Sequence, residues 1–184
     1  MEITKTDFHD LLIIKPKIFE DSRGYFFESY NQKNLSELFK NLNFVQDNQS
    51  KSSYGTIRGL HYQLAPFAQT KLIRVLQGEI YDVVVDIRKN SPTYGKHFGI
   101  VLSDINNIQL YIPQGFAHGF SVLSETAIAL YKTDNFYQKE SERGINFNDT
   151  LLNIDWKIDT NKSIISPKDK VLPSFKESEK NFNF

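Results

Sequence analysis

Alternation of apolar and polar side chains marks the clearest strand of the chain, at residues 80–87. Its two faces are formed by alternating positions, with Tyr81, Val83, Val85 and Ile87 on one and Ile80, Asp82, Val84 and Asp86 on the other. A period of two is typical of a β-strand. The segment Gln77-Gly78-Glu79 lies directly before it and predicts a hairpin turn after a strand at Lys71–Leu76.

Short apolar runs between turn signals predict most of the remaining elements. Further strands are expected at Leu11–Pro16, Phe98–Leu102, Gln109–Ile112, Gly119–Leu123 and Ala127–Thr133. One helix is expected near Leu35–Lys40, with Asn34 as its N-cap and Glu37 three residues later. The C-terminal part, 151–184, contains two prolines and mixed polarity, which predict short helical turns and coil.

Many short strands with regular turn signals predict a β sandwich or barrel. A jelly roll is one such architecture, and its mouth can hold a ligand, although periodicity alone does not choose it over other sandwiches. The sequence contains no internal repeat, low-complexity tract or Gly/Ser/Pro-rich linker. We therefore expect one domain spanning residues 1–184.

Composition narrows the functional classes. Twenty-two basic residues balance twenty-two acidic ones, so no global attraction to nucleic acid or to an anionic membrane is expected. The absence of cysteine excludes disulfides and thiol chemistry. The first residues do not resemble a signal peptide, and no apolar segment approaches the roughly 18 residues that span a bilayer. We expect a cytoplasmic protein without nucleic-acid or membrane partners.

Two histidines lie in unusual local sequences. His61 lies in the segment IRGLHYQ at 57–63, and His118 lies in IPQGFAHGF at 112–120. The second segment matches the P-x-G-x-x-H core of a cupin motif, and alternation places His118 on one face with Phe120 and Val122. Since histidine has a pKa near neutrality, each of the two could be a catalytic base or a hydrogen-bonded core residue.

The first of these segments departs from the metal-binding cupin pattern. Metal cupins usually carry two histidines spaced H-x-H with a carboxylate, whereas this chain has His61 followed by Gln63. Two histidines without a nearby carboxylate set make a poor divalent site. We therefore expect no bound metal and no cofactor, and a histidine that is free to act as a base.

Other residues could contribute chemistry or could equally be structural. Tyr131 shares a strand face with Ala127 and Ala129, so a phenol could stand beside space left by small side chains, or could be an ordinary core tyrosine. Arg58 and Lys71 could bind pyrophosphate or stabilise an oxyanion, or could face water. The segment 21–28 packs charge, glycine and aromatic residues together, which suits either nucleotide contacts or a solvated edge strand.

Taken together, these segments resemble the dTDP-4-dehydrorhamnose 3,5-epimerase family. The matching stretches occur in family order and cover nearly the whole chain: FEDSRGYFFESYN (19–31), FVQDNQSKS (44–52), IRGLHYQ (57–63), QTKLIRVLQGEIYDVVVDIRKNSPTYG (69–95), IPQGFAHGF (112–120), LYK (130–132) and SPKD (166–169). The combination of RGLH, PxGFAHGF and a downstream YK is specific.

The resemblance implies a mostly β, cupin-type jelly roll with a few short helices, and a homodimer that acts on a dTDP-linked 4-keto-6-deoxyhexose. It implies catalytic roles for His61 as general base, Asp169 as its dyad partner, Tyr131 as the acid on the opposite face of the sugar and Lys71 as the cation at the enolate oxygen. It places the following residues around the substrate: Arg23, Phe26, Glu28, Gln46, Asn48, Arg58, Asp82, His118, Tyr137 and Lys168. Strict alternation would put Arg58 and His61 on opposite faces of one strand, and a bulge at Gly59 would bring both inward.

The sequence alone leaves several alternatives open. Related enzymes invert only one centre, act on other dTDP- or GDP-sugars, or move a keto group between C3 and C4. A metal cupin, such as a dioxygenase or phosphosugar isomerase, is disfavoured by the missing H-x-H. A non-catalytic sugar-binding cupin would leave the base, acid and lysine without a purpose.

Overall fold

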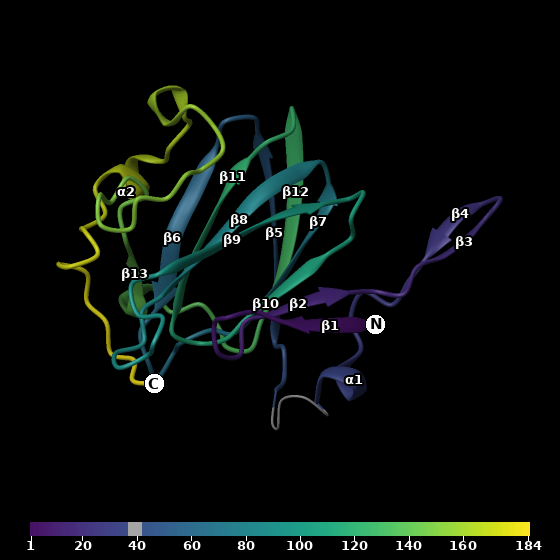
Figure 1. Ribbon diagram of the computed structural model, residues 1–184, viewed down its shortest axis with the longest axis horizontal. Coiled ribbons are helices and arrows are strands. Elements are labelled where there is room, and N and C mark those ends of the chain that lie inside the picture. Colours follow the sequence, from purple (N-terminus) through teal and green to yellow (C-terminus); the bar gives the residue numbers. More distant parts are fainter. Residues whose placement is uncertain (37–41) are drawn as a thin grey trace.

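Two antiparallel sheets form the body of the protein, seen in a computed structural model that describes residues 1–36 and 42–184 (Figure 1). In spatial order, the first sheet contains β1 (Glu2–Lys5), β2 (Leu12–Lys15), β10 (Gln109–Ile112), β7 (Lys71–Gln77), β12 (Thr126–Thr133) and β5 (Gln46–Ser53). The second contains β13 (Glu142–Gly144), β6 (Ile57–Gln63), β11 (Phe116–Val122), β8 (Glu79–Asp86) and β9 (His97–Ser103). A separate ribbon of β3 (Phe19–Asp21) and β4 (Gly24–Phe26) projects from this body as an arm.

The alternation seen in β8 separates two apolar clusters. Ile80 and Val84 pack into the core between the sheets, together with residues of β7, β11 and β12. Val83 and Val85 face the other way, into a second cluster that contains Trp156 from the C-terminal segment. Both faces of β8 are therefore covered, and the expected period of two is confirmed.

The turn at Gly78 is real, but the predicted hairpin is wrong. Gly78 adopts a φ of +78°, as a tight turn requires. However, β7 pairs with β10 and β12, whereas β8 pairs with β11 and β9. The turn thus passes the chain from one sheet to the other, because the apolar faces of β7 and β8 meet across the core instead of pairing side by side.

The helix prediction needs a correction. Helix α1 runs over Gln32–Ser36, so Asn34 lies inside it and is not its N-cap. The backbone N–H of Asn34 instead donates to Oδ1 of Asn31, 3.4 Å away, at the start of the helix. The rest of the predicted helix, Glu37 included, lies outside the described residues.

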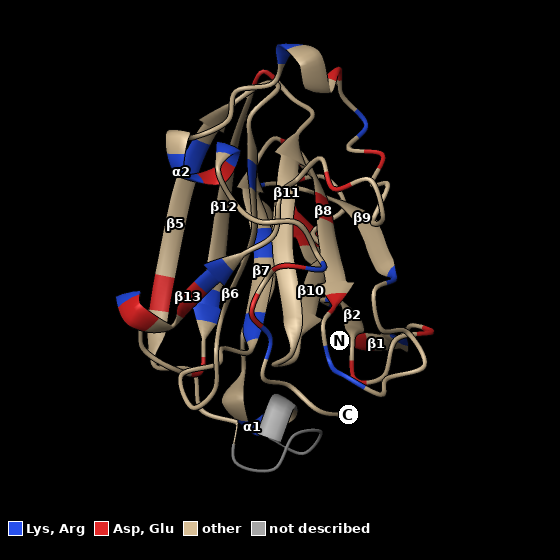
Figure 2. Cartoon of the chain, turned by 90° about the vertical axis from the view of Figure 1, so that its left-hand side faces the viewer, with Lys and Arg blue, Asp and Glu red and all other residues tan. Residues whose placement is uncertain are grey.

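The C-terminal segment follows the expectation of short turns and coil. It contains a 3₁₀ turn at Thr160–Lys162 and the four-residue helix α2 (Pro167–Lys170), while another 3₁₀ turn lies earlier at Lys139–Ser141. Ser166 caps α2 by accepting a hydrogen bond from the backbone of Asp169. The segment lies against the outer side of β6 and β13, so α2 stands at one end of that sheet (Figures 1 and 2). Across the described residues, no helix has the length and apolar character that crossing a membrane requires.

Candidate active site

A histidine–carboxylate pair lies where α2 meets β6. Nε2 of His61 is 2.8 Å from Oδ1 of Asp169, and the other carboxylate oxygen accepts the backbone N–H of Gly59 at 3.2 Å. Burial alone would raise the pKa of Asp169, but the hydrogen bonds from His61 and Gly59 keep that pKa below its usual value. Since the carboxyl is then ionised and can only accept, Nε2 is the nitrogen that donates, and in the neutral form of the ring the lone pair is on Nδ1.

The expected irregularity in β6 is present at Gly59. The register with β11 shifts, because His61 pairs with His118 while Arg58 pairs with Phe120. Gly59 has a φ of +115°, and a Cβ there would lie 2.6 Å from the backbone of the neighbouring strand. Only glycine fits this position, and the shift allows both Arg58 and His61 to line one cavity.

That cavity has a volume of about 770 Å³, in the range of small-molecule sites. It opens between the two sheets, beneath α2 and the segment before it. Ten of the residues expected at the site line it: Gln46, Asn48, Arg58, His61, Lys71, His118, Tyr131, Tyr137, Lys168 and Asp169. These expected residues come from five strands, one loop and helix α2, which lie far apart in the sequence.

Tyr131 and Lys71 reach the cavity from the sheet opposite His61. They lie on the neighbouring strands β12 and β7, with the Lys71 ammonium 6.0 Å from the centre of the Tyr131 ring. Burial raises the pKa of Tyr131, so its phenol keeps its proton at neutral pH. Burial lowers the pKa of Lys71 to about 8, although the carboxylates of Asp82 and Glu142 act in the opposite direction. At pH 7 the cavity thus holds a phenol and an ammonium on the sheet that faces His61.

A second histidine–carboxylate pair lies deeper. Nε2 of His118 is 2.8 Å from Oδ2 of Asp82, and both side chains are buried. His118 lines the cavity, whereas Asp82 stands behind it and does not. Asp82 therefore orients His118 and is not a wall of the site. Its second oxygen, Oδ1, has no hydrogen-bond partner among the described residues.

Charged and polar groups surround the outer part of the cavity. Glu142 accepts hydrogen bonds from the Tyr137 hydroxyl at 2.8 Å and pairs with the Lys168 ammonium at 2.5 Å. Burial raises the pKa of Glu142, but these two donors bring it below its usual value. Nearby, the amide of Gln46 donates to Asn48 at 2.9 Å. Cations at a cavity of this size suit an anionic, phosphate-bearing ligand.

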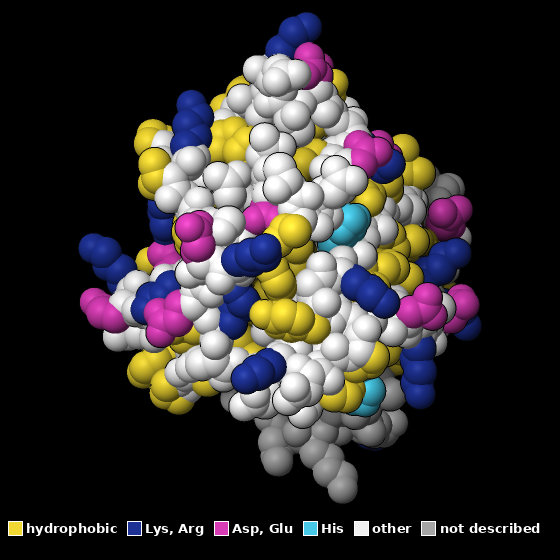
Figure 3. All heavy atoms as spheres, turned by 60° about the vertical axis from the view of Figure 1, so that its left-hand side comes forward, with side chains coloured by type: hydrophobic (Ala, Val, Ile, Leu, Met, Phe, Trp, Pro, Cys, Tyr) yellow, Lys and Arg dark blue, Asp and Glu magenta, His cyan; other side chains and the backbone are white. Residues whose placement is uncertain are grey.

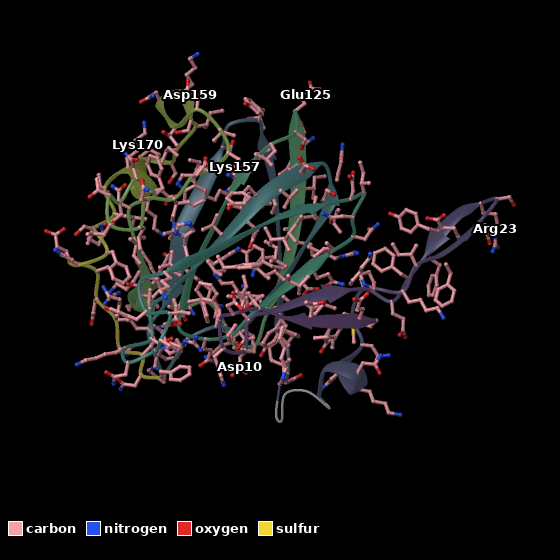
Figure 4. The ribbon with its side chains drawn as sticks, viewed as in Figure 1. Asp10, Arg23, Glu125, Lys157, Asp159 and Lys170 are labelled. Atoms are coloured by element: carbon pink, nitrogen blue, oxygen red, sulfur yellow. The ribbon has the colours of Figure 1, made fainter. Side chains whose placement is uncertain are left out.

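Three of the expected substrate-binding residues lie elsewhere. Arg23, Phe26 and Glu28 belong to the arm and its base, and none lines the cavity of their own chain. Arg23 sits at the far end of the arm, which extends from the side of the molecule opposite α2 (Figure 4). There it pairs with Asp21, while Glu28 accepts a hydrogen bond from Asn31. Within one chain, the fold does not bring these three residues to the cavity that holds the other expected site residues.

Sequence reasoning missed Glu142 altogether. It lies at the start of β13, a three-residue strand with no periodic pattern, and its role emerges only when β13 pairs with β6. Ser52, which accepts a hydrogen bond from Arg58 at 2.9 Å, was missed because β5 was not recognised as a strand. Within the described part of the chain, no group of three His, Cys, Asp or Glu side chains is placed to hold a metal ion.

The comparisons with known proteins agree with this geometry. A model of the family described as dTDP-4-dehydrorhamnose 3,5-epimerase matches residues 5–177. The chain is 54% identical over 170 residues to the dTDP-4-dehydrorhamnose 3,5-epimerase of Shigella flexneri, covering 92% of this chain and 93% of the relative.

Solved structures give the same result. The chain is similar to the dTDP-4-dehydrorhamnose 3,5-epimerase of Elizabethkingia anophelis, with a TM-score of 0.92 and 55% identity over 96% of this chain and 97% of the other. It is also similar to the dTDP-6-deoxy-D-glucose-3,5-epimerase of Legionella pneumophila in complex with dTDP-4-keto-L-rhamnose, with a TM-score of 0.91 and 46% identity over 96% and 93% of the two chains. The expected cupin-type jelly-roll class is confirmed.

Proposed function

The chain belongs to the dTDP-4-dehydrorhamnose 3,5-epimerase family, and from this premise we propose that it inverts carbons 3 and 5 of dTDP-4-dehydro-6-deoxyglucose to give dTDP-4-dehydrorhamnose. The observation that carries the proposal is the placement of base and acid on facing sheets. His61 projects from β6 in one sheet, and Tyr131 from β12 in the other. A sugar ring held between them would offer one face to each.

The chemistry begins with a proton next to a ketone. Nδ1 of His61 takes the proton from the carbon beside C4, and the C–H electron pair moves to the C4 oxygen to form an enolate. Asp169 stabilises the imidazolium that results. The Lys71 ammonium stabilises the negative oxygen, at a position where a developing charge forms. No redox step is involved, since the electron pair stays within the substrate.

Tyr131 completes the inversion. Its phenol delivers a proton to the same carbon from the opposite face, and the phenolate and the imidazolium then exchange protons with water. Because burial raises the pKa of Tyr131, the phenol is protonated before the step and is a suitable general acid. The second carbon beside the ketone is inverted by the same sequence of steps.

The outer cavity is the proposed site of the nucleotide diphosphate. Arg58 and Lys168 would contact phosphate, Gln46 and Asn48 the nucleotide, and Tyr137 the sugar–phosphate end of the substrate. Before substrate binds, Lys168 pairs with Glu142. A bound diphosphate would replace Glu142 as the ion-pair partner of Lys168.

Incubation with dTDP-4-dehydro-6-deoxyglucose in deuterated water tests the proposed reaction. We expect deuterium at both C3 and C5, together with dTDP-4-dehydrorhamnose. Deuterium at one carbon alone would identify a single-centre epimerase, and a migrating keto group would identify a ketoisomerase. Retained dTDP binding without any exchange would support a sugar-binding protein.

We also propose a homodimer in which each arm completes the partner's cavity. Phe19, Tyr25 and Phe26 are largely exposed on the arm, and Arg23 is directed away from its own body. Exposed aromatic side chains on a projecting ribbon favour a protein partner. A second copy of this chain would receive Arg23, Phe26 and Glu28 at its nucleotide end.

Complementation tests this arrangement. Arg23→Ala and His61→Ala should each be inactive as homodimers, yet co-expressed chains should regain activity, because one site of each mixed dimer then carries neither change. Absence of any recovery, or a monomer in sedimentation at micromolar concentration, would refute the arrangement.

Residues 1–184 are proposed to form one cytoplasmic domain without a nucleic-acid partner. The C-terminal segment shares an apolar cluster with β6 and β8, which supports a single folding unit. On the face shown in Figure 3, basic side chains are interspersed with acidic and apolar ones, which is consistent with the balanced charge of the chain.

A further inference from the structure

Gln63 occupies the position at which a metal cupin would carry its second histidine, and the reaction outlined above gives it no task. It is the last residue of β6 and is only 4% exposed. Its strand partner is Glu142, which receives the Tyr137 hydroxyl. A buried amide beside the site therefore needs a physical explanation.

All the hydrogen-bonding groups of this amide are directed at backbone atoms. Its Nε2 donates to the carbonyl of Phe67 at 2.6 Å and to that of Phe136 at 3.1 Å. Its Oε1 accepts the N–H of Gln138 at 2.7 Å. Gln63 thus makes hydrogen bonds with the backbone of Phe136 and Gln138, the residues immediately before and after Tyr137.

Tyr137 itself is 53% exposed and lies on the loop between β12 and the turn at Lys139–Ser141. Its backbone N–H donates to Gln46 at 3.2 Å, and its hydroxyl reaches Glu142. An aromatic side chain on an exposed loop would lose conformational freedom on binding a ligand, and prior fixation of the loop reduces that cost.

We propose that Gln63 is a positioning residue that fixes Tyr137 at the cavity mouth for the nucleotide sugar. This inference rests on the proposed role of Tyr137 in substrate binding. Gln63 acts on affinity and not on the proton transfers, because its amide is engaged with the loop backbone. In metal cupins this position carries a metal ligand, whereas in this chain Gln63 orders the loop that carries Tyr137.

Gln63→Glu tests the proposal, since it keeps the shape of the side chain and replaces two donors by acceptors facing carbonyl oxygens. We expect the Kd for dTDP and the KM for the sugar nucleotide to rise about tenfold. We expect kcat to stay within about twofold of wild type. Asn106→Asp is the matched control, because Asn106 also makes three backbone hydrogen bonds, with Val101, Ser103 and Ile108, outside the cavity. Its Kd and KM should equal those of wild type.

A double variant separates positioning from general destabilisation. In a Tyr137→Ala background, Gln63→Glu should weaken dTDP binding no further, since its effect passes through Tyr137. A fully additive loss, or a fall in kcat with unchanged KM, would overturn the proposal while leaving the role of Tyr137 intact. Unchanged dTDP binding by Tyr137→Ala would instead refute that role, and the inference with it.

Folding provides the remaining check. If Gln63→Glu does not fold, Gln63→Met removes the hydrogen bonds without adding charge and takes its place in the same measurements. Loss of the fold in both variants would overturn the proposal, because Gln63 would then support the whole structure and not one loop.

Discussion

Replacing Lys71 by methionine should make the protein more stable while abolishing its activity. The Lys71 ammonium is held in the cavity between the sheets, where burial lowers its pKa from 10.5 to about 8. The attraction of Asp82 and Glu142 is too weak to offset the loss of hydration. The folded protein thus carries a buried ammonium that destabilises the fold. In the proposed mechanism this ammonium stabilises the enolate oxygen.

The size and sign of the effect follow from the pKa values. A difference between 10.5 and about 8 corresponds to about 3 kcal/mol of destabilisation. Below pH 8 the lysine is charged in both the folded and the unfolded state, so the full cost is present. Between pH 8 and 10.5 the unfolded state binds more protons, so the stability of wild type rises with pH. The advantage of Lys71→Met should therefore be largest at pH 7 and should shrink above pH 8.

Urea unfolding followed by tryptophan fluorescence measures this directly. Trp156 is the one tryptophan of the sequence and is buried, so its emission reports unfolding. At pH 7 the midpoint of Lys71→Met should lie about 1 M above that of wild type. Lys176→Met, at an exposed lysine, is the control and should not shift it. A less stable Lys71→Met, or a gain that does not change between pH 7 and 9.5, would show that the buried Lys71 ammonium does not destabilise the fold.

Three further predictions concern pH, metal and backbone. The kcat/KM of wild type should fall as pH rises above about 8, because Lys71 loses its proton there; a profile that is flat to pH 10 would contradict this. Turnover should persist in EDTA, since the Gln63 amide is bonded to backbone; loss of activity that one divalent ion restores would overturn the metal-free mechanism. Gly59→Ala should lower the free energy of unfolding in urea by about 3 kcal/mol or more, because its Cβ would lie 2.6 Å from backbone atoms. Gly55→Ala has open space around it and should cost about 1 kcal/mol. Equal losses in the two variants would show that the close approach at Gly59 does not decide the cost.

The sequence predicted the strands that obey a simple hydrophobic rule. The alternation of apolar and polar residues identified β8, and short apolar runs next to turn signals identified β2, β7, β9, β10, β11 and β12. β5 was not recognised, because Gln46–Ser53 contains no apolar residue. Polar residues that face the cavity alternate with polar residues that face solvent. The polar character that suits this strand to ligand binding is therefore the reason why no hydrophobic pattern identified it.

Parts of the site depend on relationships that no local pattern contains. The family resemblance supplied Asp169, which reaches His61 across 108 positions of sequence, whereas periodicity could not have paired them. Glu142 was missed because its importance comes from Lys168 and Tyr137, which approach it only in the folded chain. The arm carrying Arg23 and Phe26 was expected near the nucleotide but lies away from the cavity, a placement that the proposed homodimer would explain.

Solvent-deuterium incorporation by His61→Ala and Tyr131→Phe, with dTDP-4-dehydro-6-deoxyglucose as substrate, tests the proposed mechanism most directly. Loss of a general base or acid typically lowers the rate by roughly 10²–10⁴. His61→Ala should neither epimerise nor exchange, because no enolate forms. Tyr131→Phe should lose epimerised product yet still exchange deuterium, since His61 can return a deuteron to the face from which it took the proton. Wild-type exchange by His61→Ala would place the base elsewhere, and wild-type epimerisation by Tyr131→Phe would assign the acid to another group; either result would contradict the mechanism.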